Sequence, residues 1–198
     1  MGGVGKTTMM EQLRKFASEN KMFKWIEKSV VGQNPNMLSV QNDIAAYLQD
    51  CDLPGRSKSV RADHLNKTIA KLLADKETIL MILDDVWGPI ELEDIGLTSP
   101  LPKGVKLWLT SRDYNICKQI AVDANSDIQE VKVDVLEEAE AHKLFSDITG
   151  VLKEHDPDKY HTGCSIVKKC GYLRLAIKLI ATTVKSEEIS VWNDRLNC

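Results

Sequence analysis

Hydrophobic residues recur along the first two thirds of the chain at two different spacings. Helical spacing predicts helices over residues 6–18, 37–49 and 62–73, and apolar or β-branched runs predict strands over residues 23–31, 79–83, 105–110 and 128–135. The run 79–83 contains no polar residue, which is typical of a strand buried on both faces of a parallel sheet. The strand 23–31 is interrupted by Glu27 and Lys28. Strands that alternate with helices predict an α/β fold with a parallel sheet.

The pattern becomes purely helical after Leu136. One predicted helix carries Ala141, Leu144, Phe145 and Ile148 on a single face, a second ends near Gly171, and a third carries Ala176, Leu179, Ile180 and Val184. We therefore predict two parts, an α/β subdomain over residues 1–133 and a small all-helical subdomain over residues 134–198 that is incomplete.

Composition narrows the class of protein. The 198 residues carry a net charge of −3 with a pI near 5.8, so we expect no nucleic-acid partner. No run approaches the roughly 18 apolar residues of a membrane span, and the first residues do not resemble a signal peptide. The five cysteines are odd in number and show no C-x-x-C spacing. We expect reduced thiols and a cytoplasmic protein.

The strongest chemical signal lies at the start of the chain. A phosphate-binding loop (P-loop) is predicted from Gly2, Gly3, Val4, Gly5, Lys6, Thr7 and Thr8, directly before a helix. The glycines let backbone N–H groups wrap a phosphate, and the helix N-terminus adds its positive dipole. Lys6 would reach the β- and γ-phosphates, and the Thr7 hydroxyl would bind Mg²⁺. The fold class is therefore a P-loop NTPase sheet flanked by helices.

The full motif G-x-x-x-x-G-K-[ST] requires a glycine one position before Met1, and a strand normally precedes that glycine. Both are missing from the chain. We expect the sequence to be a fragment whose first strand is missing, and we expect that strand to lie inside the sheet.

Two aspartates close the apolar run 79–83. Asp84 is expected to hold Mg²⁺ together with Thr7, because an acidic residue at the end of a buried strand emerges beside the P-loop. Asp85 is the candidate catalytic residue, which would orient or deprotonate an attacking water. By themselves, two aspartates after a strand are more often a solvated turn, so this interpretation depends on the P-loop.

An arginine ends the next predicted strand. Arg112 follows Leu109-Thr110-Ser111 and could reach the terminal phosphate, where it would distinguish ATP from ADP. Guanine recognition uses N-K-x-D, whereas Asn66-Lys67 is followed by Thr68-Ile69. The expected ligands are therefore ATP or ADP with Mg²⁺. The four histidines are scattered, and we expect none of them to be a ligand.

Taken in order, these segments resemble the nucleotide-binding (NB-ARC) region of plant disease-resistance proteins with leucine-rich repeats. The resemblance rests on five segments: residues 2–8, 79–87, 106–112, 137–145 and 170–177. The tryptophan at position 87 resembles the residue that the coiled-coil type of receptor has at this point of the motif. The last segment is similar to the family's "GLPL" motif and adds Leu173 and Arg174 as candidate cofactor-binding residues.

The resemblance implies a molecular switch that binds ADP at rest and ATP when activated. Slow Mg²⁺-dependent hydrolysis, at most, would reset it. The implied partners are an adenine nucleotide, an N-terminal signalling domain and leucine-rich repeats of the same receptor, with self-association on activation. Tyr172 and Arg174 replace the family's second glycine and its proline, His142 replaces a tryptophan, and Glu27 and Lys28 replace apolar strand residues.

Two alternatives remain open at this point. A partitioning-type ATPase shares the loop Gly-Gly-Val-Gly-Lys-Thr-Thr but depends on an additional upstream lysine. A nucleotide-dead scaffold would explain Tyr172 and Arg174, because base binding in relatives uses the proline that Arg174 replaces.

Overall fold

The computed structural model describes residues 2–49, 53, 55 and 57–197. These form two compact units, one made of Thr7–Glu130 and the other of Val131–Cys198 together with Met1–Lys6. We predicted the division at residues 133 and 134, and the contacts divide the chain between Glu130 and Val131. Two of the five cysteines, Cys51 and Cys198, lie outside the described residues.

The first unit is built on a three-stranded parallel sheet. Its strands are β1 (Trp25–Gly32), β2 (Ile79–Val86) and β3 (Val105–Ser111), in the order β1-β2-β3. In the register of the sheet, Ile82 of β2 lies opposite Lys28 of β1 and Trp108 of β3. The apolar run of β2 is fully buried because this strand is central and both of its faces are covered.

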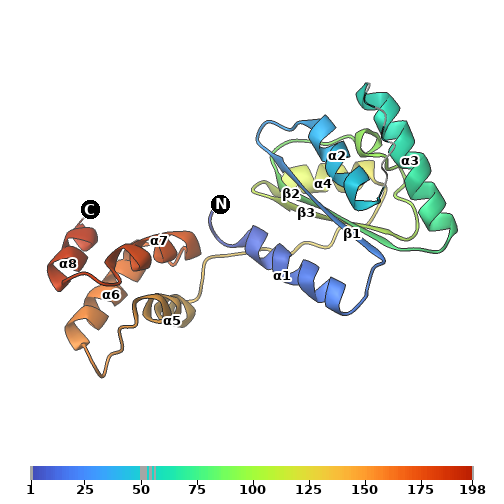
Figure 1. Cartoon of the computed structure of the whole chain (residues 1–198). Coiled ribbons are helices and arrows are strands. Elements are labelled where there is room, and N and C mark those ends of the chain that lie inside the picture. The colour runs from blue at the N-terminus through green and yellow to red at the C-terminus, as the bar shows by residue number, and fades with distance from the viewer. Residues whose placement is uncertain (1, 50–52, 54, 56, 198) are drawn as a thin grey trace. The chain divides into compact units, whose positions relative to one another are not determined.

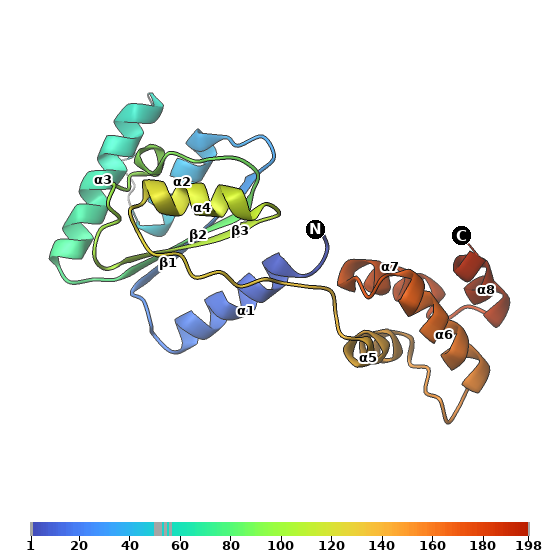
Figure 2. The same ribbon diagram turned by 180° about the vertical axis from the view of Figure 1, so that it is seen from behind.

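Helices cover the two faces of this sheet unequally (Figures 1 and 2). Helix α1 (Lys6–Glu19) covers one face, where Met10 and Ala17 pack against Ile26, Leu80 and Ile82. The other face carries α2 (Met37–Tyr47), α3 (Lys58–Ala74), the 3₁₀ helix η1 (Leu92–Ile95) and α4 (Tyr114–Asp123). The larger core of the unit lies on this second face.

The second unit contains four helices among its described residues: α5 (Glu138–Thr149), α6 (Pro157–Lys169), α7 (Arg174–Val184) and α8 (Ile189–Asn197). Their core includes Phe145 and Trp192, whose rings meet edge to face at 5.5 Å between centroids. The indole N–H of Trp192 donates to the carbonyl of Val184 at 2.8 Å. Trp192 thereby holds α8 against the end of α7.

The sequence-based assignment was wrong or incomplete at four places. The predicted strand 128–135 has no regular secondary structure: Val131 is 71% exposed, and none of the described strands pairs with this segment. Helices α4 and α8 were not predicted. Leu179 was one of the apolar residues from which the third helix was predicted, but it is 62% exposed, and Ile177 and Ala181 are buried instead.

We expected a missing first strand to lie inside the sheet. Among the described strands, however, β2 pairs directly with both β1 and β3, so no gap separates them. None of the described helices has the length and apolar character that a membrane crossing requires. Three cysteines are described, Cys117, Cys164 and Cys170, and all three are free thiols.

Candidate functional site

The carboxylate of Asp84 is the centre of a hydrogen-bonded cluster at the end of β2. Asp84 is only 2% exposed. The Thr7 hydroxyl, 77 residues away along the chain, donates to Asp84 Oδ1 at 3.1 Å, and the Thr110 hydroxyl donates to the same oxygen. The first turn of α1 and the ends of β2 and β3 therefore meet at one buried carboxylate.

A local irregularity separates Asp84 from Asp85. The register between β2 and β3 shifts between Leu83 and Val86, and Asp85 adopts a left-handed backbone conformation with φ of 56°. Its N–H donates to the Thr110 hydroxyl at 2.8 Å instead of to a backbone carbonyl. The Asp84 side chain consequently stays buried, whereas the Asp85 side chain is 38% exposed.

Arg112 lies beside Asp85. Its Nε is 3.7 Å from Asp85 Oδ1, and its Cζ lies 4.3 Å from the centre of the Trp87 ring. A guanidinium over an indole face is attracted by the ring quadrupole. Trp87 and Asp85 together hold the arginine at the carboxyl end of β3, where its side chain remains 46% exposed.

Lys28 is a member of the cluster that the sequence did not assign to the site. Its Nζ lies 2.5 Å from Glu11 Oε1 of α1 and 3.2 Å from Asp84 Oδ2. Burial alone would lower the pKa of Lys28, but the contacts with Glu11 and Asp84 outweigh burial and raise the pKa. The feature of the sequence that could have pointed to Lys28 is its charge, which interrupts an otherwise apolar strand pattern.

The oxygen atoms of Thr7 and Asp84 suit Mg²⁺, which prefers hard oxygen ligands and is commonly bound by one or two carboxylates plus phosphates and waters. Among the described residues, no group of three or more His, Cys, Asp or Glu side chains could form a complete protein site for a metal. The donor set therefore fits a cation whose coordination a phosphate completes, with weaker binding to the protein alone.

The glycine loop belongs to the same compact unit as the helices α5 to α8. Gly3 and Gly5 have φ of 75° and 111°, values that side chains disfavour. The N–H of Leu175 donates to the Gly3 carbonyl at 3.2 Å. A Cβ on Gly3 would lie 3.0 Å from the Leu175 Cβ, so glycine permits this close approach to the start of α7.

Leu173 and Arg174, predicted from the last motif, lie against this loop. Leu173 Cδ2 is 3.6 Å from the position that a Cβ of Gly3 would occupy, and Arg174 Cδ and Nε are both 3.4 Å from the equivalent position of Gly5. The residue in the place of the family's proline thus extends its side chain along the glycine loop.

The other predicted loop residues are placed as follows. Gly2 is the first residue of the loop, Val4 is buried at 4% exposure, and Lys6, Thr7 and Thr8 form the first turn of α1. The loop therefore leads directly into a helix of 14 residues, as the motif requires.

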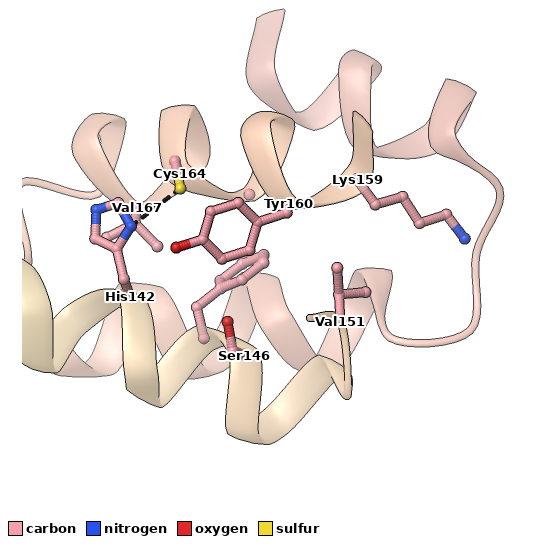
Figure 3. Close-up of a pocket in the computed structure, with 9 residues that line it drawn as sticks. His142, Ser146, Val151, Lys159, Tyr160, Cys164 and Val167 are labelled. Carbon is pink, nitrogen blue, oxygen red and sulfur yellow. Dashed lines mark hydrogen bonds between the residues drawn. The ribbon is translucent and has the colours of Figure 1, made fainter. Parts of the chain in front are cut away.

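A separate hollow lies between α5 and α6, inside the helical unit (Figure 3). His142 Nδ1 and Cys164 Sγ are 3.1 Å apart there, and Tyr160 lies beside them. Burial raises the pKa of Cys164, so its thiol is protonated at neutral pH. The cavity is about 10 Å³, room for about one water molecule. It is far too small for a nucleotide. His142 and Phe145 of the segment 137–145 line it, but none of the predicted catalytic, cofactor-binding or metal-binding residues does.

Comparison with known proteins places these features in a family. Residues 1–154 match the family model described as the NB-ARC domain. The chain is 32% identical over 197 residues to "Putative disease resistance protein At5g05400" and 33% identical over 204 residues to "Probable disease resistance protein At4g27220", both of Arabidopsis thaliana. These alignments cover 98% and 100% of this chain but 22% and 21% of the relatives. The chain thus spans about a fifth of the length of the relatives that it matches.

A solved structure shares the fold. It is described as the Aeropyrum pernix ORC2 protein in ADPNP-ADP complexes, and it superposes with a TM-score of 0.65 over 99% of this chain and 59% of that chain. Sequence identity is 14%, so this likeness demonstrates the fold alone.

Proposed function

The chain belongs to the NB-ARC family, and from that premise we propose that it is the adenine-nucleotide switch of a plant disease-resistance protein. In this proposal it binds ADP at rest and ATP when activated, with slow Mg²⁺-dependent hydrolysis resetting it. The contact that supports this proposal most strongly is the one between the Thr7 hydroxyl and the Asp84 carboxylate. It joins the P-loop helix to the strand end expected to face the phosphates.

Each residue has a proposed task. The N–H groups of Gly2, Gly3, Val4 and Gly5 would bind phosphate oxygens, Lys6 would pair with the β- and γ-phosphates, and Thr8 would extend the N–H cradle at the helix start. Thr7 and Asp84 would hold Mg²⁺, which neutralises phosphate charge when bound. Leu173 and Arg174 would lie on the nucleotide from the start of α7.

Asp85 and Arg112 would respond to the γ-phosphate. Asp85 is exposed enough to orient a water molecule and accept its proton, which is the role of a general base. Arg112 is held by Asp85 at 3.7 Å, and a γ-phosphate would compete for the same guanidinium. Binding of ATP would therefore move Arg112 away from Asp85, and this differential contact could bias two states of the switch.

The cellular setting is also part of the proposal. We assign the receptor to the coiled-coil class on the basis of Trp87, expect it in the cytoplasm, and expect self-association and contacts with other receptor domains on activation. The partitioning-type ATPase is not favoured, because the family match covers residues 1–154. A nucleotide-dead scaffold is the second candidate, favoured by the Arg174 side chain that lies along Gly5.

Calorimetric titration with ADP, ATP and GTP in the presence of Mg²⁺ tests the proposal. We expect ADP and ATP to bind and GTP to be discriminated against. Lys6→Ala should weaken ADP binding by roughly tenfold to more than a hundredfold, because a hydrogen bond to a charged group is worth about 1.5–3 kcal/mol. Lys15→Ala, an exposed position on the same helix, is the control and should bind as the wild type does. Absence of ADP and ATP binding in the wild type would support the scaffold instead.

A further inference from the structure

We propose that Lys28 acts as an internal counter-cation of Asp84, which weakens divalent-metal binding at this carboxylate and reduces the metal dependence of nucleotide binding. This inference rests on the proposed function, because it concerns the metal at the same nucleotide site. It assigns a role in setting metal affinity to a strand residue outside the five motif segments.

The two carboxylate oxygens of Asp84 have different partners. Oδ1 accepts the hydroxyls of Thr7 and Thr110, so Oδ2 is the carboxylate oxygen that retains most capacity for a cation. Lys28 Nζ lies 3.2 Å from Oδ2. The position that a divalent ion would take at this oxygen is therefore next to a positive charge that the protein supplies itself.

The side chain of Lys28 is held in place by its surroundings. Lys28 lies opposite Ile82 in the sheet, and its side chain is 17% exposed under α1. Glu11 Oε1 holds Nζ at 2.5 Å, and Glu11 Oε2 is held in turn by Arg14 Nε at 2.9 Å. An ammonium fixed from two sides cannot swing away to solvent as a surface lysine can, so it remains near an incoming cation.

Electrostatics decide the direction of the effect. Like charges a few Å apart repel strongly where water is excluded, and Asp84 is almost fully buried. A divalent ion at Asp84 must overcome this repulsion or displace Lys28 towards Glu11. Conversely, Lys28 already compensates the Asp84 charge when no metal is bound. The site should therefore lose less nucleotide affinity without metal than a site that has only the carboxylate.

Mn²⁺ is a suitable probe, since its binding is measured directly by electron paramagnetic resonance without nucleotide. We expect Lys28→Met, which keeps the length of the side chain and removes its charge, to bind Mn²⁺ at least tenfold more tightly than the wild type. Lys28→Gln should change affinity in the same direction and provides a polar variant if Met disturbs folding. Adding Asp84→Asn to Lys28→Met should abolish the gain, which locates it at this carboxylate. Lys71→Met, at an exposed position of α3, is the charge control and should leave affinity unchanged.

A second arm uses ADP. Removing divalent metal with EDTA should change ADP affinity less than threefold in the wild type and at least tenfold in Lys28→Met. Loss of ADP binding under all conditions would reject the nucleotide site, while the Mn²⁺ arm would still judge Lys28 by itself. A purely structural ion pair would lower the melting temperature of Lys28→Met and Lys28→Gln and leave their Mn²⁺ affinity equal to the wild type. Equal Mn²⁺ affinity in the wild type and both variants would overturn the inference.

Discussion

At the scale of single residues, Glu27 is the least expected side chain in the core. It lies in β1 opposite Met81, a member of the larger core cluster, and it is 1% exposed. Its Oε1 accepts the Ser29 hydroxyl, but Oε2 has no hydrogen-bond partner within the described part of the chain. Burial raises the pKa of Glu27 to about 7, and nearby Asp43 adds to the increase, while the Ser29 bond opposes it. A carboxyl group in this position is stable mainly when protonated.

Glu27 predicts an unusual dependence of stability on pH. Because the folded pKa, about 7, lies above the ordinary value of 4.5, the folded state binds the proton more tightly than the unfolded state. The stability contributed by the protonated group is fully present below pH 4.5 and is lost as the pH rises through 7. A shift of this size corresponds to about 3 kcal/mol. Urea denaturation between pH 4.5 and 8 should show this loss in the wild type and a flatter profile in Glu27→Gln.

The control for this measurement is Glu19→Gln on the exposed face of α1, which should retain the profile of the wild type. A profile that is identical in Glu27→Gln and the wild type would show that Glu27 does not titrate in this range.

At the scale of elements, η1 fixes the packing of α2 and α3 on the larger core. The Gln41 amide of α2 donates to the carbonyls of Lys58 and Asp94 at 2.9 and 2.7 Å and so ties α3 and η1 together. Gly96 ends η1 with φ of 80°. The Asn66 amide of α3 donates to the Gly96 carbonyl at 3.0 Å. This short helix therefore contacts α3 through backbone groups at very close range.

Gly96→Ala should be strongly destabilising. Its Cβ would lie 2.6 Å from the Leu65 Cβ and 2.9 Å from the Asn66 backbone nitrogen, and the positive φ would be strained in addition. We expect a loss of about 2 kcal/mol or more in the free energy of unfolding. Urea denaturation followed by tryptophan fluorescence measures it. Gly88→Ala is the matched control, because its Cβ meets no atom within 4 Å. Equal stability of the two variants would contradict the close packing of η1 on α3.

At the scale of the whole molecule, the described chain consists of two units that each have their own core. Residues 126–137 join them without regular secondary structure, and Lys132 is exposed within that segment. Its Nζ contacts Asp134 at 2.8 Å, a surface ion pair of two exposed side chains that stabilises little. The segment is therefore exposed around Lys132, whereas Leu136 is anchored to the helical unit by its N–H, which donates to the Tyr172 carbonyl at 3.1 Å.

Such a segment should be the preferred site of limited proteolysis, because a protease needs an accessible backbone that can extend into its active site. Brief digestion with trypsin should yield fragments 1–132 and 133–198, identified by mass spectrometry. Lys132→Gln should suppress both fragments. If trypsin cuts the wild type first within α3, for example after Lys67, the joining segment is more ordered than we infer.

The sequence by itself determined the central strand, the order of the motifs and the helical character of the second unit. Residues 79–83 are apolar throughout because β2 is covered on both faces, and this requirement is visible in local spacing. The motif at residues 2–8 and the aspartates after β2 were also readable, because glycine and carboxylate positions follow from backbone and phosphate chemistry.

The tertiary structure alone decided which side chains meet. Residues 128–135 alternate like a strand, but no strand in the described part of the chain pairs with them, and alternation alone cannot reveal that a partner is missing. Lys28 was visible only as an interruption of a strand, and its contact with Asp84 depends on the register between β1 and β2 and on α1 above them. Arg174 meets Gly5 across most of the chain length. Local periodicity reports whether a residue is buried, whereas long-range pairing depends on how separate elements pack.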